Sequence, residues 1–127
     1  MKNFLLIALL IGVPVGSYWL FRDDKSAAYA GGGDVAAAVA SGQPVLLNFY
    51  ADWCGPCKMV APEVKALAHD LAGQARVVRI DVDERSDLAQ QYGIRSIPAF
   101  VALSNGKESR RMTGAISRAQ MRGMLGL

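Results

Sequence analysis

The sequence predicts an α/β domain, with a central mixed β-sheet flanked by helices, preceded by an N-terminal transmembrane helix. Three observations predict it. An uncharged apolar run opens the chain, and short apolar runs of strand length then alternate with helix-periodic segments. An Asn-Gly pair between two strand-like runs indicates a hairpin, which adds antiparallel strands to the sheet. A chain of 127 residues can bury one core of this kind.

Residues 1–21 are predicted to be a signal anchor. Residues 4–21 carry no charge, and as a helix they would span about 27 Å, close to the hydrocarbon thickness of a bilayer. A cleaved signal peptide, giving a secreted form, is the alternative, because residues 28–30 (AYA) have the form of a cleavage site. Lys2 precedes the run, so we expect a single pass through the inner membrane with the domain facing the periplasm or outside.

Two regions follow the anchor. Residues 22–33 are small and polar and end in three glycines, which is typical of a flexible tether. Residues 34–127 form the predicted soluble domain. Its expected elements are a helix over 35–40, a strand over 45–50, a helix over 58–71, a strand over 77–82, a helix over 86–91, strands over 99–103 and 108–113, and a helix over 118–125. Met59 and Val60 belong to the apolar pattern of the helix over 58–71.

Charge and composition exclude one class of function. The chain has 14 Lys and Arg against 11 Asp and Glu, and its basic residues are scattered rather than striped. A nucleic-acid-binding protein would instead gather basic residues on one face. We therefore expect no nucleic-acid partner, and we expect a monomer.

The candidate chemistry lies in Cys54 and Cys57, three positions apart between a buried strand and a helix. The chain has no other cysteine and a single histidine, His69, so a zinc site with four Cys or His ligands cannot be completed. We therefore expect no metal and no cofactor. A structural disulfide is possible, but so small a loop constrains the unfolded chain little. A helix N-terminus favours a thiolate, which lowers the pKa of Cys54, and Cys57 lies one turn away. The pattern indicates a redox-active pair.

Residues 48–58 (NFYADWCGPCK) resemble the active-site segment of the thioredoxins. Further matches follow without gaps at Pro62, over residues 92–98 (YGIRSIP), at the Asn-Gly pair of residues 105–106, and at Gly114. The resemblance covers about residues 34–125. It implies the thioredoxin fold and a dithiol–disulfide exchange activity.

The resemblance also implies roles within the Cys54-Gly55-Pro56-Cys57 segment. Cys54 would attack a substrate disulfide, a mixed disulfide would form, and Cys57 would resolve it. The intervening Gly-Pro favours reduction, because in thioredoxins it accompanies a stable disulfide and hence a reducing dithiol. The alternatives are a disulfide oxidase or isomerase of the same fold, and a partner-binding domain with little turnover.

Residues around the pair receive implied roles as well. Pro98 would be a cis-proline beside the cysteines, Ile97 would offer backbone groups to an extended substrate, and Trp53 would cover the site. Ile97 is in any case pushed toward extended geometry because it precedes a proline. Lys58 is either a solvated helix residue or a modest electrostatic aid to the thiolate.

Three features depart from the family pattern. Asn48 stands where thioredoxins usually carry a buried Asp that accepts the proton of the resolving cysteine, and an amide has no titrating group. Arg79 replaces the neighbouring Lys, and one interpretation has its guanidinium pointing to solvent. The family's first strand would fall near residues 25–30 (KSAAYA), a poor strand former that leaves this edge weak or missing.

These inferences together predict a thiol–disulfide oxidoreductase that reduces protein disulfides outside the cytoplasm. Its expected partners are protein disulfides or dithiols and a membrane or periplasmic electron donor. The N-terminal helix would attach it to the membrane.

Overall fold

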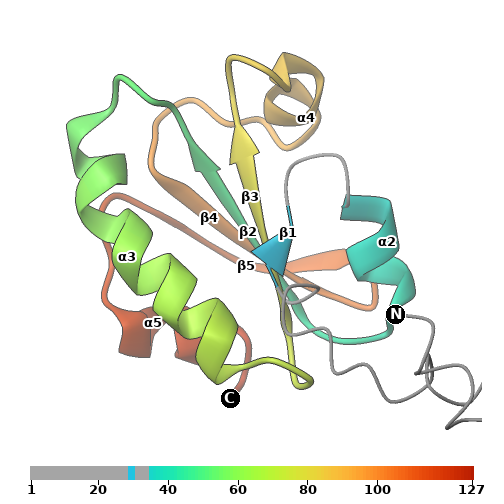
Figure 1. Cartoon of the computed structure of the whole chain (residues 1–127). Coiled ribbons are helices and arrows are strands. Elements are labelled where there is room, and N and C mark those ends of the chain that lie inside the picture. Colours follow the sequence, from blue (N-terminus) through green and yellow to red (C-terminus); the bar gives the residue numbers. More distant parts are fainter. Residues whose placement is uncertain (1–28, 31–34) are drawn as a thin grey trace, which may run out of the picture.

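The structure, a computed structural model, describes residues 29–30 and 35–127 (Figure 1). The predicted transmembrane segment, residues 1–21, and most of the predicted tether over residues 22–33 lie outside the described residues. Among the residues that are described, no helix has the length and apolar character needed to cross a membrane. Tyr29–Ala30, which fell within the predicted tether, instead form a short strand.

The described elements are, in chain order, β1 (Tyr29–Ala30), α2 (Val35–Ala40), β2 (Val45–Tyr50), α3 (Gly55–Asp70), β3 (Arg76–Asp81), α4 (Ser86–Gln91), β4 (Ala99–Ser104), β5 (Lys107–Thr113) and α5 (Arg118–Met124). The strands form one sheet in the order β1-β3-β2-β4-β5. Strands β1, β3 and β2 are parallel, whereas β4 runs antiparallel to β2, and β5 to β4. The predicted mixed sheet is therefore confirmed.

Strand β1 completes one edge of the sheet. Tyr29 and Ala30 pair in parallel with Val77 and Val78 of β3. The strand is present although its sequence forms strands poorly, because the backbone of β3 offers it a ladder of hydrogen-bonding groups. It is limited to two residues, which agrees with the expectation of a weak edge.

Helices cover both faces of the sheet, α3 and α5 on one side and α2 and α4 on the other (Figure 1). Strand β2 lies at the centre, and its side chains alternate between the two faces, as a pleated strand requires. Leu46 packs in the core beneath α3 and α5, whereas Leu47 and Phe49 pack in the opposite core. By the same alternation, Asn48 faces α3.

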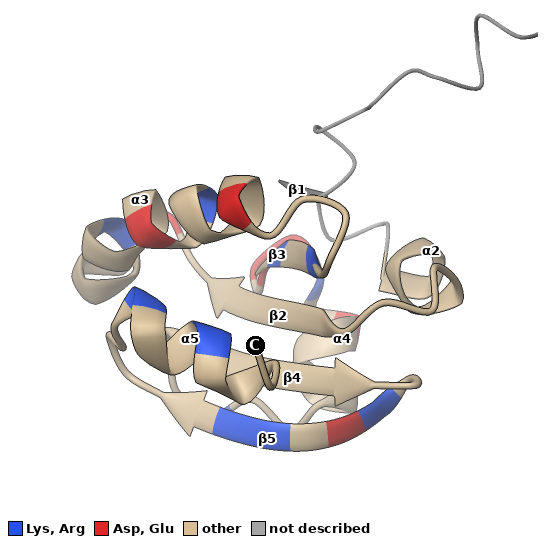
Figure 2. Cartoon of the chain, turned by 90° about the horizontal axis from the view of Figure 1, so that it is seen from below, with Lys and Arg blue, Asp and Glu red and all other residues tan. Residues whose placement is uncertain are grey.

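Turns and caps follow the sequence signals. Asn105 and Gly106 both have positive φ angles, 52° and 77°, which is the geometry of a two-residue hairpin turn. Ser117 and Gln120 form a reciprocal capping box at the start of α5. Arg118 on α5 then binds Glu63 and Asp70 of α3, so the two helices are joined across their exposed sides (Figure 2).

The structure shifts the bounds of several expected elements and corrects the placement of one side chain. Helix α3 begins at Gly55 rather than at residue 58, and β3 covers Arg76–Asp81 rather than residues 77–82. Met59, assigned to the apolar face of the helix, is 78% exposed. It lies outside the core because Val60 and Val64 already fill the side of α3 that meets the sheet.

The methionines allow a direct test of this core assignment. Met121 on α5 is fully buried, so Met121→Ala should lower the free energy of unfolding by about 2–5 kcal/mol through cavity formation. Met59→Ala is the matched control, and it should change stability by no more than about 0.5 kcal/mol because its side chain lies in water. Urea unfolding followed by circular dichroism measures both. Equal losses would contradict the packing described here.

Candidate redox-active site

The junction of β2 and α3 positions the two cysteines. Cys54 is the N-cap of α3, with extended backbone angles (φ −88°, ψ 112°), and Cys57 lies in the first turn. The two form a disulfide with their Cα atoms 5.3 Å apart. The Cys57 backbone N–H points at Cys54 Sγ, 3.3 Å away. A capping side chain normally accepts such an N–H, so a reduced Cys54 sulfur is placed where negative charge is stabilised.

Gly55 and Pro56 form the first turn between the cysteines, and both are exposed. Proline suits this place because the first helical N–H groups have no intrahelical partner. A Cβ at Gly55 would meet no atom within 4 Å, so the site has open space at this position.

The two cysteines are both buried, to slightly different extents. The cysteines pack with Ala51 in a small apolar cluster, against which Tyr50, Val82 and Ile97 are placed. Cys54 is 5% exposed and Cys57 only 1%. Cys54 is therefore the slightly more accessible of the two residues.

Ile97 and Pro98 form the second wall of the site. Their peptide bond is cis, as expected from the resemblance, and Pro98 is buried. The Ile97 carbonyl oxygen lies 3.9 Å from Cys54 Sγ. Pro98 in turn accepts a hydrogen bond from Gly114 N at 2.8 Å, which ties this wall to the end of β5.

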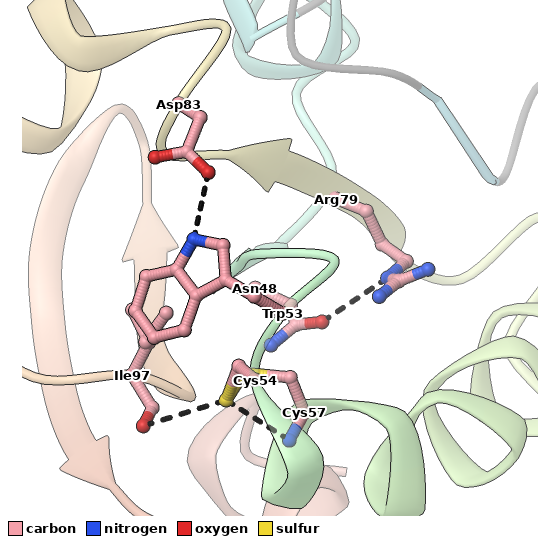
Figure 3. The surroundings of a disulfide bond; sticks show 7 residues. All are labelled: Asn48, Trp53, Cys54, Cys57, Arg79, Asp83 and Ile97. Atoms are coloured by element: carbon pink, nitrogen blue, oxygen red, sulfur yellow. Dashed lines mark hydrogen bonds between the residues drawn. A yellow bond between two sulfur atoms is a disulfide. The ribbon is translucent and has the colours of Figure 1, made fainter.

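Trp53 and Lys58 flank the pair. The Trp53 indole is 70% exposed, and its Nε1 donates to Asp83 Oδ2 at 2.9 Å (Figure 3). The side chain is therefore held beside the disulfide rather than packed into the core. Lys58 is exposed, and its backbone N–H donates to the Cys54 carbonyl at 3.2 Å.

A polar pair lies beneath the disulfide. Asn48 is fully buried, and it stands directly opposite Arg79 in the β2–β3 register. Arg79 Nε donates to Asn48 Oδ1 at 3.3 Å, and the guanidinium carbon lies 3.8 Å from the centre of the Tyr50 ring. Arg79 thus turns to these two neighbours, which corrects the interpretation of a purely solvent-facing side chain.

Sequence reasoning gave no role to Tyr50 or Asp83, and it named Arg79 as the neighbour of Asn48 without assigning it a contact with the amide. The strand period of two could have found Tyr50 and the contact of Arg79, since Tyr50 shares the face of Asn48, and Arg79 shares the face of Val77. No comparable signal marked Asp83, because its contact with Trp53 joins two loops 30 residues apart. Within the described part of the chain, no group of three or more His, Cys, Asp and Glu side chains is placed to hold a metal ion.

The fold and the pair at its helix N-terminus define a thiol–disulfide oxidoreductase. Comparisons with known proteins agree. The family model described as thioredoxin matches residues 33–126. The chain is 47% identical over 79 residues to thioredoxin 1 of Chlorobaculum tepidum, covering 62% of this chain and 78% of that protein. It is 40% identical over 86 residues to the thioredoxin of Haemophilus influenzae, covering 68% and 80%.

Solved structures are similar as well. A mutant thioredoxin from Halobacterium salinarum aligns with a TM-score of 0.69 at 35% identity, covering 76% of this chain and 85% of that one. Reduced Schistosoma mansoni thioredoxin aligns with a TM-score of 0.68 at 32% identity, covering 77% and 94%. The protein belongs to the thioredoxin family.

The different positions of Cys54, at the N-cap of α3, and Cys57, in its first turn, predict different effects of their substitution. Cys54→Ser should abolish exchange, because no accessible nucleophile remains. Cys57→Ser should accumulate a mixed disulfide between Cys54 and the substrate, since a second thiol is needed to release it. Non-reducing electrophoresis and mass spectrometry detect the adduct, with the double Ser variant as control. Turnover by Cys57→Ser at the parent rate would reverse this assignment.

Proposed function

We propose that this thioredoxin-family protein reduces disulfide bonds in other proteins. The observation that carries the proposal is the pairing of Cys54 at the N-cap of α3 with the more deeply buried Cys57 one turn away. Cys54 would attack as a thiolate, and Cys57 would then form the Cys54–Cys57 bond and release the substrate. Two electrons pass from the protein dithiol to the substrate disulfide, and the substrate leaves as two thiols.

The Gly-Pro sequence between the cysteines supports reduction over oxidation, because it accompanies reducing dithiols in thioredoxins. An oxidase or isomerase of the same fold would use the same atoms with a different redox balance. A domain that only binds a partner protein would have the same apolar surroundings around its cysteines, but it would not catalyse repeated disulfide exchange. The redox potential of the cysteine pair distinguishes a reductase from an oxidase or isomerase. Measurable turnover distinguishes all of these from a partner-binding domain.

The remaining site residues have supporting roles in this proposal. Ile97, preceding cis-Pro98, would offer its backbone to an extended segment of the substrate, beside Cys54 Sγ. Trp53, with its exposed indole, would also contact the substrate, and Lys58 would add positive charge near the thiolate.

We further propose that residues 1–21 anchor the protein in the inner membrane, with residues 34–127 in the periplasm or outside the cell. The uncharged run of residues 4–21 supports an anchor. Only residues 22–28 separate the proposed anchor from β1, and fully extended they would reach about 23 Å at roughly 3.3 Å per residue. Protein disulfides would then be reduced close to the membrane surface, with electrons supplied by a membrane or periplasmic donor.

Turnover and potential test the reductase proposal. The full chain in detergent should catalyse the reduction of insulin by dithiothreitol. The Cys54–Cys57 pair should equilibrate with glutathione at a potential nearer to about −270 mV, typical of thioredoxins, than to the roughly −120 mV of strongly oxidising relatives. The Cys54→Ser variant is the control. A potential near the oxidising value would favour the oxidase, and absence of turnover would favour the partner-binding domain.

Membrane extraction tests the anchor. The protein should remain in the membrane pellet after washing at alkaline pH or high salt, because such washes do not remove a transmembrane helix. Its reduced cysteines should react in intact cells with a thiol reagent that does not cross the inner membrane. A variant that begins at residue 22 and lacks the run is the control. Recovery of a soluble mature form starting at Gly31 would contradict the anchor.

A further inference from the structure

A buried amide nitrogen beneath the disulfide has no partner. Among the described residues, Asn48 Nδ2 is the one fully buried side-chain nitrogen or oxygen without a hydrogen bond. A primary amide carries two N–H donors, and leaving them unpaired in the interior is unfavourable. In the close-up the nitrogen points toward the cysteine pair, on the side of the amide away from Arg79 (Figure 3).

Arg79 fixes which end of the amide faces the cysteines. Its Nε carries a hydrogen and can only donate, so the group that it meets must be the Asn48 oxygen. Tyr50 holds the guanidinium from a second side, with the ring centre 3.8 Å from the Arg79 guanidinium carbon. A reversed amide would place two donors together at Arg79. The nitrogen is therefore held toward the sulfurs.

We propose that Asn48 Nδ2 donates a hydrogen bond to the sulfur of Cys57 when the disulfide is open, and that Arg79 is the positioning residue for this donor. Cys57 is the natural acceptor, because Cys54 Sγ already faces the Cys57 backbone N–H and the Ile97 carbonyl. The inference rests on the proposed role of Cys57 as the resolving thiol, and it assigns Asn48 the task of stabilising the thiolate of that residue.

The donor acts in the second half of the exchange. In the mixed disulfide, Cys57 loses its proton to solvent, and the thiolate Sγ attacks Cys54 Sγ. The Cys54–Cys57 bond forms, the bond from Cys54 to the substrate sulfur breaks, and the substrate leaves as a thiolate that takes up a proton. A hydrogen bond to the charged form favours that form, so the donor increases the fraction of Cys57 that can attack. Asn48 itself neither gains nor loses a proton.

Other ionisable side chains lie near the cysteine pair. The ionisable side chains on the segments that surround the cysteines are Tyr50, Asp52, Lys58, Arg79, Asp81, Asp83 and Arg95. Asp83 is engaged by Trp53, and Asp81 accepts the Asp83 backbone N–H at 2.9 Å. Lys58 and Asp52 are exposed, so water screens them more than it screens the buried amide.

The resolving step can be followed by itself. The reduced full chain in detergent is mixed with 5,5′-dithiobis(2-nitrobenzoate), and stopped flow records two releases of the coloured thiolate. The first reports attack by Cys54, and the second reports attack by Cys57 on the mixed disulfide. Asn48→Leu, which keeps similar volume but has no donor, should slow the second release relative to the first by about tenfold at pH 7. The pH midpoint of the second release should rise by about one unit.

The stability of the oxidised protein distinguishes a hydrogen-bonding role of Asn48 from a packing role. Asn48→Leu removes the buried Nδ2 donors that have no partner in the oxidised protein. It also removes the Oδ1 acceptor of Arg79, but Arg79 is only half-buried and can bind water instead. The disulfide form should therefore unfold at the same or a higher urea concentration while resolution slows. Loss of stability in proportion to loss of rate would overturn the proposal. An unchanged ratio of the two releases and an unchanged pH midpoint would also overturn it.

Arg79 is tested with its own matched control. Arg79→Met should slow the second release because the amide can turn, and Arg79→Lys should restore most of the rate by donating again to Asn48 Oδ1. Arg76→Met removes an arginine from the other end of β3, opposite Val45, and should match the parent. If Arg79→Met also matches the parent, the positioning role is wrong. If the protein fails to reduce insulin but its second release still depends on Asn48, only the reductase proposal is rejected.

Discussion

The passage of strand β2 into helix α3 is the constraint on which the rest of the site depends. The backbone at the end of β2 is satisfied from the end of β3, since Tyr50 O accepts a hydrogen bond from Val82 N at 2.9 Å, whereas the N-terminus of α3 carries N–H groups without intrahelical partners. Residues 51–54 connect the two elements, and Cys54, the last of them, caps the helix, so its sulfur takes the place of a capping oxygen. One helical turn later, Cys57 returns to the interior. This junction accounts for the slightly different burial of the two cysteines.

The sheet order brings the other parts of the site to the same place. Because β2 and β3 are parallel, their ends lie side by side, and β4 starts there because it runs antiparallel to β2. The end of β2 leads to Trp53, the loop after β3 carries Asp83, and the residues before β4 are Ile97 and Pro98. Segments 45 residues apart in sequence therefore enclose one disulfide. The hairpin of β4 and β5 secures the last of them, through the Gly114 hydrogen bond to Pro98.

Hydrophobic pattern predicted most of the fold, because β2 and β4 are buried on both faces and their sequences consist of apolar runs. The start of α3 was placed too late, since Gly55 and Pro56 disfavour a helix interior but are compatible with a first turn. Periodicity also misplaced Met59, because a helix can carry an apolar residue beyond the stripe that meets the core. The cysteines were evident from spacing and resemblance. The resemblance placed Arg79 near Asn48, but the hydrogen bond between them was not predicted, since it depends on a strand register that the sequence does not state.

The proposed hydrogen bond from the buried amide to reduced Cys57 would also shift the reduction potential of the cysteine pair. A donor that is unpaired beside the disulfide and paired in the reduced state favours the dithiol, which makes the protein a weaker reductant. One hydrogen bond contributes about 1 kcal/mol net, equivalent to roughly 20 mV for a two-electron couple. About 150 mV separates thioredoxins from strongly oxidising relatives, so this contribution is several times too small to reverse the direction of exchange. The proposed role of Asn48 is thus compatible with the proposed reduction of protein disulfides.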